Sequence, residues 1–391
     1  MINTLNVGML TQFFTPKLGG PYNAIIELVS QFRKIDINTN IYTTSSLSQI
    51  GKGRTQFIQK INENLKIFRF DSYLRFKEYR ISFKMLPYML KNAEKIDILH
   101  SHALRSFQED VGNFISLTKH KPMVITPHGG ININWDYSDK IPKFFHDKTL
   151  GAFRELFNNP HYIAVAKCEI PIIKNYGIKE KQIHYIPHGI NTKLFKPVDP
   201  SHLRKKYNLE DKKVLLYVGR IAKGKGVDKL IKILNYLTKK DKNIVLFIIG
   251  NDSGYLKKVV SLVKKFNLQK YIIFTGFKEK KDLPKYYSLA DIVIYPSRQE
   301  IFGLVIGEAG ACGKPVIGSD ILGPSEIIID GKTGYQSDFN NLKNLSERIL
   351  ELINDKDLLS ELGGNARERI LKHYSWENAA KLHKELYQKL I

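Results

Sequence analysis

The sequence has few cysteines, no long apolar stretch and no basic leader, and each absence argues against a class of protein. Only two cysteines occur in 391 residues, Cys168 and Cys312, and neither has a CxxC partner. This argues against a disulfide framework and favours a reducing compartment. No apolar run reaches the roughly 18–20 residues needed to cross a bilayer, and MINTLNVGMLTQFF reads as a first strand, not as a signal peptide. We therefore expect a cytoplasmic protein.

Metal-binding patterns are equally scarce. A single Asp-x-Asp triplet occurs, at residues 355–357, in a helical stretch where it reads as a solvated helix face. Histidines recur at the ends of predicted strands, at His100, His102, His128 and His188. Zinc is the alternative interpretation of these histidines, but their spacing matches no HExxH motif, and no cysteine or clear carboxylate completes a shell. We expect neither a metal ion nor a tightly bound cofactor.

Acidic residues are outnumbered, with 61 Lys and Arg against 38 Asp and Glu and a formal net charge of +23. The excess is shared by both halves of the chain and forms no basic tail. A bias toward lysine explains it without any function. Attraction to a phosphorylated substrate, a negative membrane surface or nucleic acid explains it equally well. Charge alone does not choose between these interpretations.

Short apolar runs alternate with helical stretches along the whole chain, the pattern of parallel sheets with crossover helices. A chain of 391 residues is long enough for two such α/β domains. The two-proline segment 191–202 reads as the linker. We predict Rossmann-like domains at 1–192 and 193–373, followed by a helix at 374–391. The predicted strands are 6–14, 40–44, 66–70, 97–102, 123–128, 162–166, 183–188, 213–219, 244–250, 271–277, 291–297 and 314–320.

The segment SRQEIFGLVIGEAGACGKPVIGSD carries the clearest ligand signal. It follows a predicted strand and opens a helix, with Glu300 in the loop and Glu308 inside the helix. Free backbone N–H groups at the positive end of the helix suit a phosphate; they belong to Phe302, Gly303 and Leu304. Two flanking carboxylates suit hydroxyl groups on either side of a diphosphate, as in a sugar nucleotide. Solvated surface glutamates are the alternative interpretation.

The segment YVGRIAKGKG places three cations, Arg220, Lys223 and Lys225, between a strand and an amphipathic helix. Fixed cations beside backbone donors suit a diphosphate leaving group, on which negative charge accumulates as the sugar bond breaks. The segment also fits GxxxxGK of a P-loop, but Gly226 stands where Ser or Thr would bind magnesium. A nucleoside triphosphatase is therefore the weaker interpretation.

Two turns in the first half are candidate ligand contacts. Gly19 and Gly20 lie in the first strand–helix turn, followed by Pro21 at the first helical position. His128 lies in TPHGG, between a proline and a glycine pair, where its side chain is the best candidate to point into a cleft. A simple tight turn and a turn histidine satisfied by its neighbours remain the alternatives.

A basic, aromatic stretch at residues 66–91 is a candidate membrane surface. It holds seven Lys or Arg against two acids, interleaved with seven aromatic residues. Such a stretch suits an anionic membrane that carries a lipid-linked acceptor. A solvated helix with its aromatic residues turned toward the core is the alternative. Peripheral attachment to the cytoplasmic face of a membrane is thus a hypothesis.

Together these segments resemble the retaining glycosyltransferases of family 4, which have the GT-B fold. The resemblance covers essentially the whole chain and is strongest at 213–335, where Glu300 and Glu308 match the family's glutamate pair. GRIAKGKG, with Arg220 and Lys225, matches its basic motif, and TPHGG, the Gly19–Gly20 turn and YSWENAAKLH are also similar to it. The sequence departs from the family pattern at two places. Residues 187–189 read PHG where the family often has PNG, and residues 322–326 read LGPSE where the family has GGIPE or GGVPE.

The resemblance implies two Rossmann-like domains around a cleft, with the C-terminal helix crossing back to the N-terminal domain. It implies a donor site formed by Gly19, Gly20, Gly219, Arg220, Lys225, Gly276, Phe277, Glu300, Phe302, Gly303, Leu304 and Glu308. Arg220 and Lys225 would bind the diphosphate and Glu308 the ribose. Glu300 would hold the transferred sugar, and His128 would contact it from the opposite domain. Glu300, His128, Arg220 and Lys225 are the predicted catalytic residues.

The expected function is therefore metal-independent, retaining transfer of a sugar from a UDP- or GDP-linked donor to a glycan or lipid-linked acceptor. A sugar-nucleotide epimerase of the same fold is the nearest rival; it would convert the donor without an acceptor. A basic nucleic-acid-binding protein is the rival outside enzymes, but no dedicated motif supports it and we expect no nucleic-acid partner.

Overall fold

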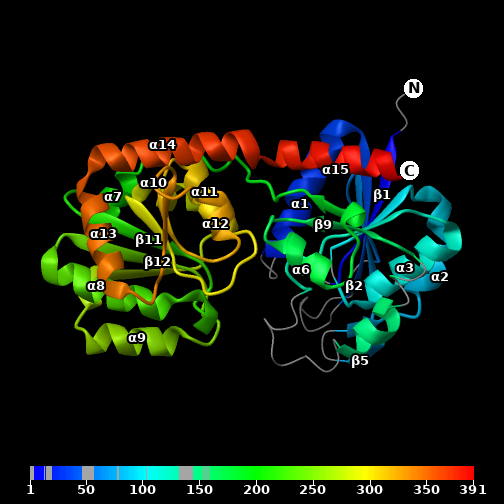
Figure 1. The fold of residues 1–391 in the computed structure, drawn as a ribbon, viewed down its shortest axis with the longest axis horizontal. Helices are drawn as coiled ribbons and strands as arrows, with labels where there is room; N and C mark the ends of the chain where they lie inside the picture. The colour runs from blue at the N-terminus through cyan, green and yellow to red at the C-terminus, as the bar shows by residue number, and fades with distance from the viewer. Residues whose placement is uncertain are drawn as a thin grey trace. The chain divides into compact units, whose positions relative to one another are not determined.

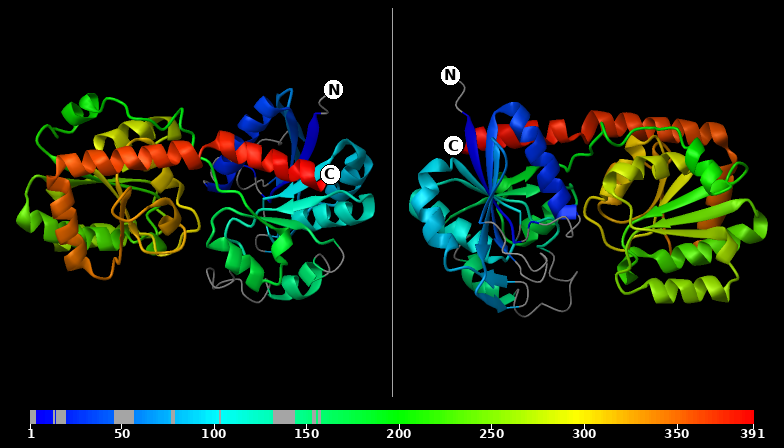
Figure 2. Two further views of the ribbon diagram at one scale, coloured as in Figure 1. Left: turned by 45° about the horizontal axis from the view of Figure 1, so that its top comes forward. Right: turned by 180° about the vertical axis from the view of Figure 1, so that it is seen from behind.

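The computed structural model describes residues 4–12, 14, 20–45, 57–76, 79–102, 104–131, 144–152, 155 and 158–391. The chain forms two compact units. Unit 1 consists of Met1–Gly189 together with Trp376–Ile391, and unit 2 of Ile190–Ser375 (Figures 1 and 2). The predicted boundaries lay at 192 and 373, whereas the chain enters unit 2 after Gly189 and leaves it after Ser375.

Unit 1 is built on an eight-stranded sheet in the order β10-β9-β8-β7-β1-β2-β4-β3, in which all neighbours are parallel except β3 and β4. Its strands are β1 Leu5–Leu10, β2 Ile37–Ser45, β3 Ile58–Asn62, β4 Leu65–Asp71, β7 Ile98–Ser101, β8 Met123–Ile125, β9 His161–Ala164 and β10 Ile183–Tyr185. A separate antiparallel hairpin joins β5 Leu74–Phe76 to β6 Tyr79–Ile81.

Helices cover both faces of the unit 1 sheet. The helices are α1 Gly20–Phe32, α2 Met85–Asn92, α3 Phe107–Lys119, α6 Glu169–Asn175 and α15 Trp376–Leu390, with short turns at Arg33–Ile35, Ala93–Lys95, Asp147–Gly151 and Glu180–Gln182. The C-terminal helix α15 packs against α1, where the rings of Phe32 and Tyr387 lie 5.9 Å apart edge to face. Both rings are fully buried, so α15 completes the core of unit 1.

Unit 2 is built on a six-stranded parallel sheet in the order β13-β12-β11-β14-β15-β16. Its strands are β11 Lys213–Val218, β12 Ile244–Ile249, β13 Ile272–Gly276, β14 Ile292–Tyr295, β15 Val316–Ser319 and β16 Gly334–Ser337. The order reverses between β11 and β14, because β12 follows β11 on one side and β14 lies on the other. Ligands of such sheets bind where the order reverses, at the carboxyl ends of the strands.

The unit 2 sheet is covered by α8 and α9 on one face and by α10, α11 and α14 on the other (Figure 1). The helices are α7 Ser201–Lys206, α8 Val227–Lys240, α9 Leu256–Lys265, α10 Leu283–Leu289, α11 Leu304–Ala311, α12 Pro324–Ile327, α13 Leu342–Asn354 and α14 Lys356–His373, with short turns at Lys223–Lys225, Gln269–Tyr271 and Lys280–Asp282. Strands that are buried on both faces explain the continuous apolar runs of the sequence. No helix in the described part of the chain is long and apolar enough to cross a membrane.

Every strand predicted from the sequence is present, with ends that differ by a few residues, and the described residues form four further strands. β3 and the β5–β6 hairpin mix apolar with charged residues, and β16 (Gly334–Ser337) is polar apart from Tyr335. Gly334 allows β16 to pair, since a Cβ there would lie 2.2 Å from the Val316 carbonyl oxygen. The basic stretch at 66–91 contains most of β4, the β5 and β6 strands and the greater part of α2.

Candidate functional site

The loops after β11 and β14 meet where the unit 2 sheet reverses its order. The Arg298 N–H donates to the Gly224 carbonyl at 2.9 Å, which ties the two loops together. Gly226 has a φ of +70°, and a Cβ there would lie 2.1 Å from the Pro296 carbonyl oxygen. Only glycine permits this close approach. The sequence thus brings the GRIAKGKG loop against the segment that carries Glu300.

Lys225 and Glu300 form an ion pair at this junction, with the lysine Nζ 3.0 Å from Glu300 Oε2. The same Nζ lies 3.3 Å from Ser297 Oγ, and the Tyr295 hydroxyl donates to the same Glu300 oxygen. The other oxygen, Oε1, accepts from the Ile301 N–H at 3.3 Å. Both side chains of the ion pair stay about a quarter exposed, at 22% and 25%, and are therefore accessible to a ligand.

The helix α11 begins directly beyond Glu300, at Leu304. Gly303 precedes it with a φ of +83° and turns the chain into the helix. N–H groups in the first turn of a helix have no intrahelical acceptor and favour anions. The Phe302 side chain is buried and packs edge to face on Tyr374. The start of α11 thus lies close in the chain to the ion pair, and phosphate binding at this turn stays a prediction.

Glu308 lies farther along α11 and is partly exposed. Its Oε2 accepts a hydrogen bond of 2.9 Å from the hydroxyl of Tyr287, a fully buried residue of α10. Burial and the neighbouring carboxylate raise the pKa of Tyr287, so the hydroxyl remains a donor. This contact fixes the direction of the Glu308 carboxylate.

Arg220 lies just beyond β11 with its side chain exposed, and the Tyr217 hydroxyl donates to its carbonyl at 2.8 Å. Gly219 precedes it with a φ of +153°, in contact with Gly250, where a Cβ would lie 1.9 Å from the Gly219 carbonyl oxygen. At the end of β13, Gly276 has a φ of +69° and Phe277 is 63% exposed. These residues belong to the same carboxyl edge of the sheet.

The predicted first-half residues lie in unit 1. Gly19 falls outside the described residues, and Gly20 is the first residue of α1. His128 follows β8 with a φ of +50°. Its Nε2 lies 3.1 Å from His102 Nδ1, and its Nδ1 lies 3.2 Å from His188 Nε2. Both ring nitrogens of His128 are therefore engaged, and a contact between this ring and a sugar would replace one of these bonds.

The direction of the hydrogen bonds in this histidine series follows from the tautomers. Each neutral imidazole has one donor and one acceptor nitrogen, so all three rings donate in the same direction. His102 Nε2 is buried without a hydrogen-bond partner in the described part of the chain. A buried orphan N–H is rarer than a buried orphan acceptor, which favours donation from His102 Nδ1 to His128 and from His128 Nδ1 to His188.

Burial keeps this part of unit 1 uncharged. It lowers the pKa of His128 to about 4, and it lowers the pKa of His102 and His188 well below the ordinary value. The His100 ring packs against the His102 ring at a tilt of 35°, with centroids 4.0 Å apart, and its Nδ1 lies 2.6 Å from the Tyr387 hydroxyl. Burial lowers the pKa of His100 in the same way. At neutral pH these rings are neutral.

Two residues that sequence reasoning missed hold the loop that carries His128. Glu169 accepts from the Gly129 N–H at 2.7 Å and from the Val165 N–H at 3.0 Å. Burial raises the pKa of Glu169 to about 7. The Arg105 guanidinium donates to the Gly130 carbonyl and to both oxygens of Asp147. An acid at the start of a helix was a weak signal for Glu169; nothing in the sequence indicated Arg105.

The structure revises the candidate membrane stretch at 66–91. Phe68 and Phe70 are buried in the core, and Arg80 is 5% exposed. Tyr73 and Phe83 are exposed and stack on each other, with ring centroids 5.6 Å apart. Lys77 falls outside the described residues. Only part of the stretch therefore forms a surface.

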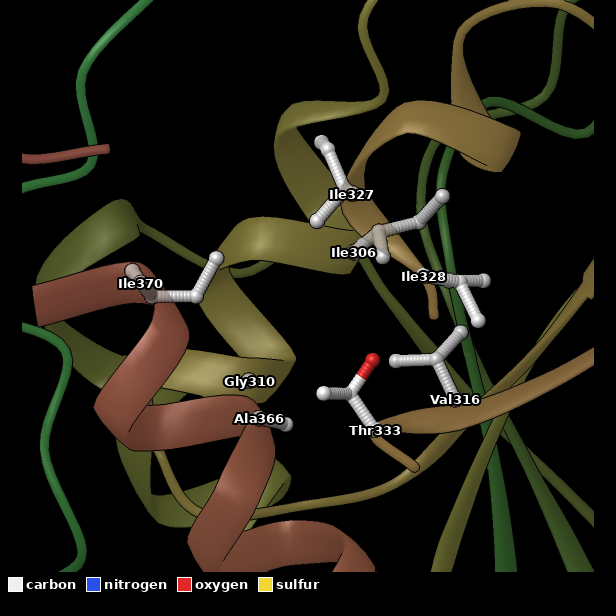
Figure 3. Close-up of a pocket in the computed structure, with 8 residues that line it drawn as sticks. All are labelled: Ile306, Gly310, Val316, Ile327, Ile328, Thr333, Ala366 and Ile370. Carbon is white, nitrogen blue, oxygen red and sulfur yellow. The ribbon is translucent and has the colours of Figure 1, made fainter. Parts of the chain in front are cut away.

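A small cavity beneath α11 is not a ligand site (Figure 3). Its volume of about 10 Å³ is near the minimum for one water molecule. Its lining is apolar except for Thr333: Ile306, Gly310, Val316, Ile327, Ile328, Ala366 and Ile370 complete it. Within the described ranges, no group of three or more His, Cys, Asp or Glu residues is placed to hold a metal ion.

Both halves of the chain match glycosyltransferase families. Residues 18–194 match the family described as Glycosyltransferase Family 4, and residues 200–369 match Glycosyl transferases group 1. The uncharacterized glycosyltransferase MJ1178 of Methanocaldococcus jannaschii is 31% identical over 98% of each chain. The GPI3 subunit of a Saccharomyces cerevisiae phosphatidylinositol N-acetylglucosaminyltransferase is 24% identical over 98% of this chain and 82% of its own.

Solved structures share the fold. The crystal structure of Anabaena HepE in complex with UDP has a TM-score of 0.82 at 18% identity, covering 99% of this chain and 100% of its own. At that identity the likeness concerns the fold alone, which is the GT-B arrangement of two Rossmann-like domains. The matches over both halves and the full-length relative together show that this chain is a glycosyltransferase that belongs to family 4.

Proposed function

We propose that this glycosyltransferase moves a sugar from a UDP- or GDP-linked donor to a glycan or lipid-linked acceptor, with retention of configuration and without a metal ion. The observation that carries the proposal is the Lys225–Glu300 pair beside the start of α11, where the sheet order reverses. Two relatives support it: HepE was crystallised with UDP, and the GPI3 subunit belongs to a phosphatidylinositol N-acetylglucosaminyltransferase.

The diphosphate would be held by Lys225, Arg220 and the backbone amides at Gly303 and Leu304. Negative charge develops on the diphosphate as the sugar bond breaks, and fixed cations and amides stabilise it without reorganisation. Lysine and arginine make charge-assisted hydrogen bonds to phosphate oxygens. These groups would take the role that a metal ion has in other transferases.

The two glutamates would hold the ends of the donor. Glu308, oriented by Tyr287, would accept from the ribose hydroxyls, and Glu300 from hydroxyls of the sugar. The exposed Phe277, next to Gly276, would lie alongside the nucleotide base. In front-face transfer the bond between the anomeric carbon and the phosphate oxygen breaks. The acceptor oxygen then bonds to the anomeric carbon on the same face and gives its proton to the leaving phosphate.

His128 would act as a neutral group toward the sugar. Its lowered pKa, about 4, makes an imidazolium unfavourable at neutral pH. His102 and His188 hold its ring, while Glu169 holds the following backbone N–H. The function we propose for His128 is therefore hydrogen bonding and not acid catalysis.

Binding of nucleotides by single variants tests the donor site. UDP and GDP are titrated calorimetrically, and transfer is followed with a panel of their sugars. Lys225→Ala should weaken binding of the preferred nucleotide about tenfold to a hundredfold, because a charge-assisted hydrogen bond is lost. Lys223→Ala removes the same charge from the exposed side of the same loop and should have little effect. Equal effects of both variants would contradict the proposed site; donor conversion without acceptor would indicate an epimerase.

We further propose that unit 1 binds anionic membranes through the exposed Tyr73, Phe83 and Lys84. Aromatic rings and lysine suit the boundary between headgroups and acyl chains. Phe83→Ser combined with Lys84→Glu should abolish sedimentation with phosphatidylglycerol vesicles. Charge reversal at Arg80 is no test, because this residue is buried. Wild-type protein that does not sediment with these vesicles, or a variant that sediments unchanged, would refute the membrane surface.

A further inference from the structure

Glu300 and Lys225 are bound to each other in the structure, although the proposed function assigns them to different parts of the donor. The lysine Nζ lies 3.0 Å from Glu300 Oε2 and 3.3 Å from Ser297 Oγ. A diphosphate must compete with the Glu300 carboxylate for this cation. The two side chains are 22% and 25% exposed, so an incoming phosphate can reach them.

Glu300 Oε2 has a second donor, the hydroxyl of Tyr295, which is the last residue of β14. Tyr295 is 5% exposed, in a strand buried throughout. The next residue, Pro296, is held by the contact with Gly226. Burial, followed by the charge of Glu300, raises the pKa of Tyr295 well above its ordinary value, so its proton is kept. Tyr295 is therefore a rigid donor.

The two donors to Glu300 differ in mobility. Lys225 ends a short helical turn in a loop and reaches Glu300 through a flexible four-carbon chain. Tyr295 has only two side-chain torsions above its hydroxyl and stands on the central part of the sheet. Lys225 can therefore leave Glu300 without moving the carboxylate, whereas Tyr295 cannot.

We propose that donor binding exchanges the ion pair: Lys225 leaves Glu300 for the diphosphate, and Tyr295 acts as a positioning residue that keeps the Glu300 carboxylate in place for the sugar. This rests on the proposed function. As a consequence of this exchange, Glu300 competes with the nucleotide for Lys225 before the donor binds, yet Glu300 is required for sugar transfer once the donor is bound.

The exchange makes a prediction that a purely structural ion pair does not. Glu300→Gln removes the competitor for Lys225, so UDP or GDP should bind about twofold to fivefold more tightly, as expected for a partly exposed pair, while sugar transfer is lost. A Glu300→Gln variant that binds the preferred nucleotide more weakly than wild type would overturn the exchange.

Tyr295→Phe tests the positioning role. With the donor sugar that is active in the panel, kcat should fall about tenfold to a hundredfold, the loss of a hydrogen bond to a charged group, with KM changed less than about threefold. Tyr236→Phe is the matched control: it also removes a tyrosine–carboxylate bond, to Glu347 at 3.0 Å, outside the site.

The outcomes separate this inference from the proposed function. If Lys225→Ala and Glu300→Gln leave both binding and transfer intact, the proposed function itself fails. If they act as described there but Tyr295→Phe behaves like Tyr236→Phe, only the positioning role is overturned.

Discussion

Mild acid should weaken unit 1 much more than unit 2, because the buried histidines belong to unit 1. Unit 2 contains two histidines, His202 and His373, and both are exposed. Among the described residues of unit 1, burial lowers the pKa of seven histidines: His100, His102, His128, His161, His184, His188 and His383. We therefore compare the stability of the two units at pH 7 and at pH 5.

The size of the effect follows from proton linkage. Burial lowers the pKa of His128 and His383 from 6.5 to about 4. Below pH 6.5 these histidines are therefore protonated in the unfolded chain, whereas in the folded protein they become protonated only near pH 4. The stability that each neutral histidine contributes is complete above pH 6.5 and lost as the pH falls. Between pH 7 and 5 each of these two histidines costs about 2 kcal/mol of unfolding free energy.

Glu169 acts in the opposite direction. Burial raises its pKa from 4.5 to about 7, so the folded protein holds a proton that the unfolded chain releases. Its contribution grows as the pH falls from 7 toward 4.5 and offsets about 2 kcal/mol of the histidine effect. His100, His102 and His188 shift in the same direction as His128, so the sum is a loss of stability for unit 1.

Hydrogen exchange along a urea gradient, read by mass spectrometry, measures the two units separately. The urea midpoint of peptides from β7 and β8 should fall between pH 7 and 5, while that of peptides from β11 and β12 should fall less. Glu169→Gln removes the opposing carboxyl and should enlarge the loss in unit 1 by about 2 kcal/mol. Midpoints that fall equally in both units, or a Glu169→Gln variant with unchanged pH dependence, would refute the reasoning.

Two glycine pairs give further predictions. Gly226→Ala places a Cβ 2.1 Å from the Pro296 carbonyl oxygen and should weaken UDP or GDP binding about tenfold, because Lys225 must move. The Cβ of Gly224→Ala, in the same loop, meets nothing within 4 Å, so this variant should bind the nucleotide as wild type does. Equal calorimetric affinities of the two variants would contradict this prediction. In α14, the Cβ of Gly363→Ala would lie 2.1 Å from the Gly313 carbonyl oxygen, so this variant should lower the free energy of unfolding by about 1–3 kcal/mol. Gly364→Ala meets no atom there and should stabilise by up to about 1 kcal/mol, which thermal unfolding would decide.

Much of the fold could be predicted from the sequence because its parallel strands are buried on both faces. Such strands read as continuous apolar runs, as in KVLLYVG and IVLFIIG. Glycines at their ends marked the carboxyl edge where ligands bind. β16 and the β5–β6 hairpin escaped prediction because their residues are polar or charged, and β16 depends on a close approach to β15 that Gly334 permits.

The residue types of the candidate site were readable for a similar reason. A carboxylate after one strand and a lysine after another had to reach the same edge once both strands belonged to one parallel sheet. The roles assigned to Arg220, Lys225, Glu300 and Glu308 remain predictions, which the variants above test.

Only the tertiary structure decided which partner each of these side chains takes. Lys225 and Glu300 are 75 positions apart, and their pairing depends on β11 lying beside β14. His128 could have faced solvent or a ligand, but folding brings His102 and His188 to its two ring nitrogens. A sequence specifies the groups that are available; which of several polar partners binds a given side chain is set by distances that exist only after the sheet has assembled.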